Sequence, residues 1–141
     1  MSNIDDLYDL YAENLSGRTF TISVREIGGR ATGEYMVRFQ DYQARHLIGE
    51  DSNWHDKKVE AFKRLCHTSG WKMVGEYVDS MGVYLDADIL VGGQNGFFGF
   101  RYDDEEDDGT YYPCTCMLAD IRDHSYRDPL WKVEDVEESW D

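Results

Sequence analysis

The sequence predicts an α+β fold in which helices cover one face of a mostly antiparallel sheet of about six strands. Several short segments alternate apolar and polar residues, as strands with one buried face do. Short turns, most of them containing glycine, separate these segments, which favours antiparallel neighbours. Other segments repeat apolar residues at helical spacing. The predicted order is α-β-β-α-β-β-β-β-α, in one compact domain over residues 1–141.

Two helices are predicted in the first half of the chain. The first spans residues 4–15, where apolar residues recur at three- and four-residue intervals, and Gly17 ends it. The second begins after Asn53, whose side chain can cap its first turn, and Gly70 closes it. Residues 40–51 support no assignment.

Strands are predicted wherever apolar residues alternate with polar ones. The segments with this pattern are residues 19–25, 34–39, 71–78, 83–91, 98–102 and 112–118. The first two form a hairpin around Gly28 and Gly29. Pro113 has no backbone N–H to donate, which places the last predicted strand at an edge of the sheet.

Residues 128–141 are predicted to form a short acidic C-terminal helix or tail. Asp128 followed by Pro129 is typical of a helix start, because proline suits the first helical position. Apolar residues then recur at intervals that place them on one helical face, namely Leu130, Val133, Val136 and Trp140.

The net charge of −15 is distributed unevenly along the chain. Residues 1–72 contain 11 acidic and 10 basic residues, whereas residues 73–141 contain 18 acidic and 4 basic residues. A negative field of this kind repels nucleic acids and anionic membranes and attracts basic surfaces. The second half therefore predicts a basic protein partner, while a role in solubility alone stays open.

The segment over residues 92–116 is predicted to be a β-hairpin with a wholly anionic tip. Its tip holds six consecutive acids, at positions 103–108, and aromatic strands flank them. Further acids lie in the segments at 83–91 and 128–141. The candidate partner-binding residues are Asp86, Asp88, Asp103, Asp104, Glu105, Glu106, Asp107, Asp108, Tyr111, Tyr112, Trp131, Glu134, Asp135, Glu137 and Glu138.

These acids could copy an array of DNA phosphates. Phosphates on one DNA strand advance about 3.4 Å each, and same-face side chains of a β-strand advance about 6.8 Å, so Asp86 and Asp88 would lie about two phosphates apart. Tyr and Trp among the candidates are typical interface anchors. Packing in the core or at its edge is the alternative for these aromatic residues.

Two kinds of metal site are weighed as alternatives. Asp104, Glu106 and Asp108 match the early positions of an EF-hand calcium loop, but Thr115 occupies the twelfth position, where a bidentate acid is required. Zinc usually needs cysteine pairs with two intervening residues, and this spacing is absent from a chain whose three cysteines are Cys66, Cys114 and Cys116. We expect buried free thiols, no metal and no cofactor.

No catalytic motif is present, and the four histidines are scattered, so we expect no enzymatic activity. Lys57, Lys58, Lys63 and Arg64 of the second predicted helix form the one concentrated basic feature. We expect this feature to be a solvated helix surface, or a partner for the acidic half of this chain or of a neighbouring copy in a homodimer, rather than a nucleic-acid site.

In size and composition the chain resembles acidic inhibitors that phages and mobile elements direct at nucleic-acid-binding defence enzymes, the anti-restriction and anti-CRISPR proteins. It also resembles immunity proteins that neutralise basic nuclease toxins. Both resemblances imply a DNA-mimic type of inhibitor that occupies a basic surface of a partner. With no signal peptide and no membrane span expected, the predicted location is the cytoplasm, that of the host cell if a phage encodes the protein.

Overall fold

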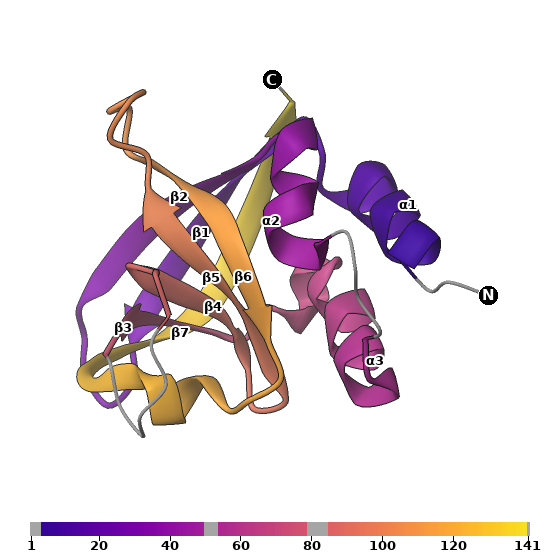
Figure 1. Ribbon diagram of the computed structural model, residues 1–141. Helices are drawn as coiled ribbons and strands as arrows, with labels where there is room; N and C mark the ends of the chain where they lie inside the picture. Colours follow the sequence, from indigo (N-terminus) through magenta and orange to yellow (C-terminus); the bar gives the residue numbers. More distant parts are fainter. Residues whose placement is uncertain (1–3, 50–53, 79–84, 141) are drawn as a thin grey trace.

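A computed structural model describes residues 4–49, 54–78 and 85–140 (Figure 1). Within these ranges, seven strands form a closed barrel in the order β1-β2-β6-β5-β4-β3-β7. Figure 1 shows the α-helices together on one side of the barrel. The prediction of a mixed α+β fold is confirmed in this coarser form, but the prediction of six strands is one too few.

The first hairpin lies close to its predicted position. Strand β1 (Arg18–Glu26) pairs antiparallel with β2 (Thr32–Phe39). Phe20, Ile22 and Val24 of β1 are buried, and Thr21, Ser23 and Arg25, which alternate with them, are at least partly exposed. The period-two pattern therefore predicted both the strand and its buried face.

Helix α1 (Ile4–Asn14) confirms the first predicted helix, and Leu7, Tyr11 and Leu15 are buried beneath it. Helix α3 (Asp56–Leu65) confirms the second, but its cap is His55, whose side chain accepts a hydrogen bond from the Lys57 N–H. Asn53 lies outside the described residues. The unassigned stretch between them contains the short helices η1 (Asp41–Gln43) and α2 (Ala44–Ile48).

The remaining strands before the C-terminal segment follow the prediction with shifted ends. Turn η2 (Thr68–Gly70) precedes the strands β3 (Met73–Tyr77), β4 (Ile89–Gly93), β5 (Gly96–Tyr102) and β6 (Thr110–Met117). The strand predicted over 83–91 begins only at Ile89, and positions 83–84 lie outside the described residues. Residues 85–88 run alongside β5, where the Asp88 N–H donates to the Phe100 carbonyl oxygen (2.8 Å).

The prediction that Pro113 marks an edge strand is wrong, because β6 lies between β5 and β2. Its parallel pairing with β2 ends at Tyr111, two residues before the proline. On the other side Pro113 is opposite Phe100, next to a register shift in the pairing of β5 with β6. The proline therefore occupies a local interruption of the ladder inside the sheet.

The predicted C-terminal helix is also wrong. Turn η3 (Ile121–His124) leads into β7 (Ser125–Trp140), which pairs with β3 on one side and with β1 on the other and so closes the barrel. A bulge in β7 breaks the alternation, so Val133 and Val136 both lie opposite apolar residues of β1 although they are three positions apart. That interval imitates helical spacing in the sequence.

Aromatic rings fill the core where the barrel meets the helices. Phe39, at the end of β2, is fully buried, and its ring contacts those of Tyr11, Phe20, Trp71, Phe98 and Phe100. A second, smaller cluster of Leu90, Phe97 and Ile121 lies between the sheet and η3. No helix in the described ranges is both long and apolar enough to cross a membrane.

Candidate protein-binding surface

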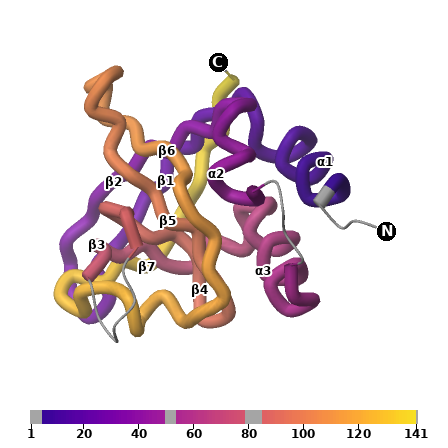
Figure 2. The backbone as a smooth tube through the Cα atoms, in the orientation of Figure 1, coloured from indigo at the N-terminus to yellow at the C-terminus, as the bar shows by residue number. Residues whose placement is uncertain are grey.

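The six consecutive acids form the connection between β5 and β6, which we call the acidic loop (residues 103–108). Figure 2 shows this hairpin tip projecting beyond the rest of the barrel. The predicted hairpin is present, since β5 and β6 pair antiparallel up to Tyr102 and Tyr111. The loop is thus presented to solvent by two long strands of the barrel.

Three carboxylates of the acidic loop are occupied by contacts within the protein. Asp103 accepts a hydrogen bond from the Glu106 N–H (3.1 Å), and the hydroxyl of Tyr102 donates to Asp107 (2.7 Å). Asp108 accepts from the Thr110 N–H (3.1 Å) and forms an ion pair with Arg38 (3.1 Å). These contacts hold the loop in shape, and Asp107 adopts a φ of 46° within it.

The same contacts set protonation at the base of the acidic loop. Hydrogen bonding from the Thr110 hydroxyl, assisted by its N–H and by Arg38, lowers the pKa of Asp108. The hydrogen bond to Asp107 raises the pKa of Tyr102. At neutral pH Asp108 is therefore ionised and Tyr102 keeps its proton.

Asp104, Glu105 and Glu106 differ from their neighbours in the acidic loop. All three are exposed, and among the described residues their carboxylates have no hydrogen-bond or ion-pair partner. They are the part of the loop whose charge is available to another molecule. No group of three or more potential metal ligands that could hold an ion occurs in the described part of the chain.

Asp86 and Asp88 are exposed, as their alternation predicted, but they lie outside a strand. Asp86 forms an ion pair with Arg101 of β5 (2.8 Å), and Asp88 accepts a hydrogen bond from the Tyr102 N–H (2.7 Å). Both carboxylates therefore help to hold residues 85–88 against β5, and the charge of Asp86 is largely balanced.

The predicted aromatic anchors are split between the inside and the outside of the barrel. Tyr111 and Trp131 are half-buried and pack against the core, and the Tyr111 ring makes edge contacts with Tyr35 and Tyr102. Tyr112 is the next residue on β6 and faces the opposite way, beside Arg101. Of the three, Tyr112 alone is placed to meet a partner.

The four candidate acids between positions 134 and 138 lie on β7 and occupy different environments. Glu134 lies at the bulge and pairs with Arg25, and Glu138 lies 3.4 Å from Arg18, above which the Trp140 ring is stacked. Asp135 and Glu137 lie opposite Ser23 and Thr21 of β1 and share their outward face, which we call the β7 face. Within the described residues, neither of these two carboxylates has an ion-pair partner.

The candidate residues therefore form two acidic areas rather than one. Strands β1 and β2 lie between β7 and β6, so three strand spacings of about 4.8 Å separate the β7 face from the base of the acidic loop, roughly 14 Å around the barrel. The outward face between them carries Thr19, Thr21 and Ser23 of β1 and Glu34, Met36 and Arg38 of β2, with Arg38 bonded to Thr19.

Sequence reasoning missed the residues that face the acidic loop across a cavity of about 350 Å³. These residues come from η1 and α2 and include Tyr42, which is 63% exposed, and His46. They lie in the stretch 40–51, whose mixed pattern supported no assignment, and no sequence signal placed them opposite residues 60 positions later.

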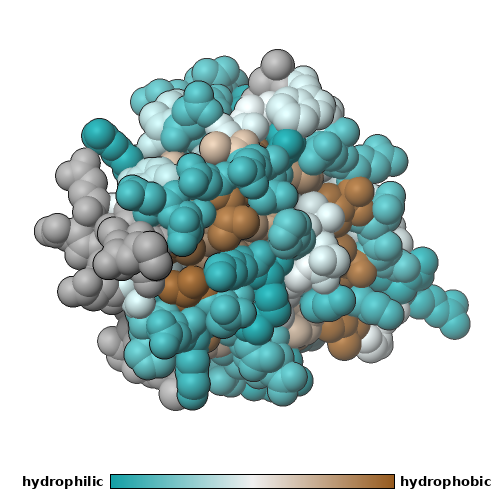
Figure 3. Space-filling model, turned by 90° about the vertical axis from the view of Figure 1, so that its right-hand side faces the viewer, coloured by the Kyte–Doolittle hydropathy of each residue, from teal (hydrophilic) through white to brown (hydrophobic). Residues whose placement is uncertain are grey.

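The basic helix α3 is remote from the acidic loop, on the other side of the molecule in Figure 1. Its one ion pair in the described structure joins Lys63 to Glu60 of the same helix (4.0 Å), and Lys58 lies over the Trp54 ring. Figure 3 views this helix side, where hydrophilic side chains separate small hydrophobic areas. The helix does not neutralise the acidic loop of its own chain.

The three cysteines are free, as predicted, with Cys66 and Cys116 buried and Cys114 half-buried. Burial raises the pKa of Cys114 to about 12, so its thiol stays protonated and contacts the carbonyl oxygens of Asp86 and Gly99 (both 3.2 Å).

Comparisons with protein-family models, with curated proteins and with solved structures find no match to this chain.

Proposed function

We propose that this chain is a non-enzymatic acidic inhibitor that occupies a basic, nucleic-acid-binding surface of a partner protein. The observation that carries the proposal is the acidic loop, which projects from the barrel and holds three carboxylates without partners inside the described structure. Unpartnered charges are the ones that a basic surface can pair with at little cost, because no internal contact has to be broken first.

The spacing of the two acidic areas supports a DNA-mimic mode of binding. The base of the acidic loop and the β7 face are roughly 14 Å apart around the barrel, which is comparable to the major groove of DNA, about 12 Å wide. Asp135 and Glu137 are same-face neighbours on a strand, about 6.8 Å apart, or about two phosphate steps. A protein surface built to contact two phosphate rows would meet two rows of carboxylates.

The partner class follows from this charge pattern. A nucleic-acid-binding defence enzyme, of the kind that anti-restriction and anti-CRISPR proteins inhibit, presents such a basic surface. A basic nuclease toxin is the second candidate, and the chain would then act as its immunity protein. A metal-binding role for residues 103–109 gains no support, since Asp103, Asp107 and Asp108 are engaged by groups of the protein itself.

The test is binding competition with DNA. The immobilised full chain would be exposed at low salt to a bacterial extract freed of nucleic acids, and retained proteins would be identified by mass spectrometry. Each would then be tested for displacement of a labelled DNA duplex by the acidic protein. We expect a retained nucleic-acid-binding protein whose affinity falls steeply with added salt.

A matched pair of triple variants isolates the acidic loop from total charge. Asp104→Asn/Glu105→Gln/Glu106→Gln removes three exposed charges from the loop, and Asp6→Asn/Asp9→Asn/Glu13→Gln removes three exposed charges from α1. We expect the first variant to lose at least about tenfold in affinity and the second to lose much less. Equal losses, or retained proteins that bind no nucleic acid, would contradict the proposal.

A further inference from the structure

The cavity beside the acidic loop has a chemistry of its own. It measures about 350 Å³, at the lower end of the roughly 300–1,000 Å³ of small-molecule sites, so it suits one side chain better than a nucleotide. All four acids at positions 103–106 line it, and no lysine or arginine does. Four carboxylates, with His46 as the one basic side chain in the lining, make the cavity attractive to cations.

Aromatic residues complete the cavity on two sides. Tyr42 belongs to the short helix η1, and Tyr112 belongs to β6, so the two come from different walls. The face of a tyrosine ring attracts cations, and it attracts flat ones best because they can also stack. Acids and tyrosines around a single cavity are thus complementary to an organic cation rather than to a metal ion.

Contacts within the protein hold the backbone of both walls in place. Strands β5 and β6 pair up to the base of the acidic loop, and Tyr102 is tied to Asp107 by its hydroxyl. On the other wall, the Gln43 side chain accepts a hydrogen bond from the Gln40 N–H (2.9 Å), and this contact caps the start of η1. A backbone that is already in place loses little conformational entropy on binding, so the cost is confined to ordering the exposed side chains.

We propose that this cavity receives an arginine side chain of the basic partner, with carboxylates of the acidic loop pairing with the guanidinium and Tyr42 and Tyr112 flanking it. Arginine is favoured over lysine because its planar guanidinium forms paired hydrogen bonds with carboxylates and stacks on aromatic rings. The inference rests on the proposed function and names the group on the partner that the acidic loop holds.

The test is an NMR titration of the isotopically labelled full chain with three small probes. N-acetyl-arginine amide carries the guanidinium, N-acetyl-lysine amide carries a compact charge, and N-acetyl-citrulline amide is the neutral counterpart of arginine. We expect saturable shifts at the residues that line the cavity, with arginine about three- to tenfold tighter than lysine. Citrulline should produce no saturable shift.

Two variants with matched controls assign the contacts. We expect Glu105→Gln to weaken arginine binding about two- to fivefold, whereas Glu13→Gln, with the same charge change on α1, should not. Tyr42→Leu should weaken it by a similar factor through loss of the ring, whereas Tyr126→Leu, at another exposed tyrosine, should not. All four positions are exposed, so the variants are expected to fold.

Three outcomes would overturn the inference: shifts that cluster away from the cavity, citrulline binding as well as arginine, or lysine binding as tightly. None of them would affect the proposed function, whose test is retention of a nucleic-acid-binding partner. Conversely, specific arginine binding in the cavity without any retained nucleic-acid-binding partner would contradict the proposed function, while the preference of the cavity for arginine would stand.

Discussion

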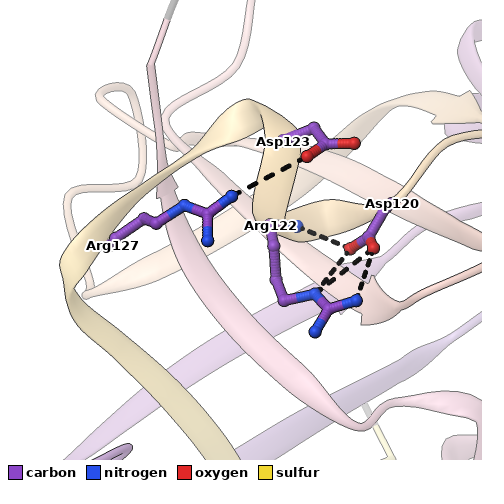
Figure 4. Close-up of polar contacts among 4 residues, drawn as sticks. All are labelled: Asp120, Arg122, Asp123 and Arg127. Carbon is purple, nitrogen blue, oxygen red and sulfur yellow. Dashed lines mark hydrogen bonds and ion pairs between the residues drawn. The ribbon is translucent and has the colours of Figure 1, made fainter.

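Asp120 illustrates how one residue here can serve two structural roles. Figure 4 shows its carboxylate accepting hydrogen bonds from the backbone and from the guanidinium of Arg122, with Asp123 and Arg127 paired beside it. The backbone bond caps η3, and the ion pair ties the same turn. The hydrogen bonds from the Arg122 side chain contribute most to lowering the pKa of Asp120 below its ordinary value of 3.8.

This lowered pKa predicts a small pH-dependent stabilisation. A carboxylate with a depressed pKa stabilises the folded state above about pH 4, and this contribution is lost as the pH falls through its folded-state pKa. Asp120→Asn keeps an oxygen that can cap η3 but has no charge to titrate. We expect the difference in unfolding free energy between wild type and variant to be constant near neutral pH and to shrink below 3.8, as measured by urea unfolding at several pH values.

Phe39 is the residue on which the aromatic core depends most. Its ring contacts five other rings, and the side chain is fully buried. We expect Phe39→Ala to reduce the free energy of unfolding by about 3–5 kcal/mol, because it leaves a cavity among groups that cannot collapse into it. Tyr126→Ala, at a side chain 53% exposed, should change it by less than about 0.5 kcal/mol in the same urea titration.

For single residues, the sequence predicted which side chains carry charge, but not which of these charges lack a partner inside the protein. Asp108 is engaged because Arg38 and Thr110 lie next to it, and Glu134 is engaged because a bulge brings it to Arg25. Arg38 and Arg25 are distant in the chain from the acids they pair with, and the local contact with Thr110 depends on the conformation of the loop. A run of six acids therefore looks uniform in the sequence although only half of it is available.

Strand β7 is the element that the sequence misrepresented. Two inward valines three residues apart resemble a helical face, and only the pairing with β1 reveals the bulge that creates this interval. By contrast, the acidic hairpin was predictable, because two aromatic segments flank a charged tip that can only lie in water. The cavity wall formed by η1 and α2 was not predictable from the sequence, because helices of three and five residues are too short to show a helical pattern.

The pairing of β7 with β1 predicts the effect of a C-terminal truncation. Deleting residues 134–141 removes the strand opposite Arg18–Ser23 and uncovers Ile22, which is fully buried. We expect a loss of about 3 kcal/mol, or roughly 10 °C in Tm by calorimetry. Deleting only residues 140–141 should have a much smaller effect, and equal Tm values for the two truncations would contradict this role of β7.

For the whole molecule, the sign of the charge predicts the response to salt. A net charge of −15 destabilises the compact state by self-repulsion, and ions screen this repulsion beyond a distance of about 10 Å at 0.1 M. We expect Tm to rise between low and moderate sodium chloride concentrations. The triple variant of the acidic loop should show a smaller rise, whereas a fall in Tm with salt would mean that attractive ion pairs dominate.

At this scale the sequence predicted the class of fold and the polarity of its surface but not the closed barrel. Closure depends on contacts such as Arg18 opposite Trp140, which no local pattern encodes. The same limitation separated the candidate acids into two areas, because their distances follow from the order of strands around the barrel. Local alternation identifies strands, whereas the pairing of distant strands determines where their side chains meet.

The pairing of the first strand with the last also has a consequence for synthesis on the ribosome. Strand β1 emerges before its partner β7, which ends at Trp140, so the barrel cannot close until all seven strands have been translated. Until then β1 and β2 form a hairpin with an open edge of unpaired backbone groups. Such long-range pairing slows folding, so the barrel is expected to form as one unit once β7 is available rather than segment by segment.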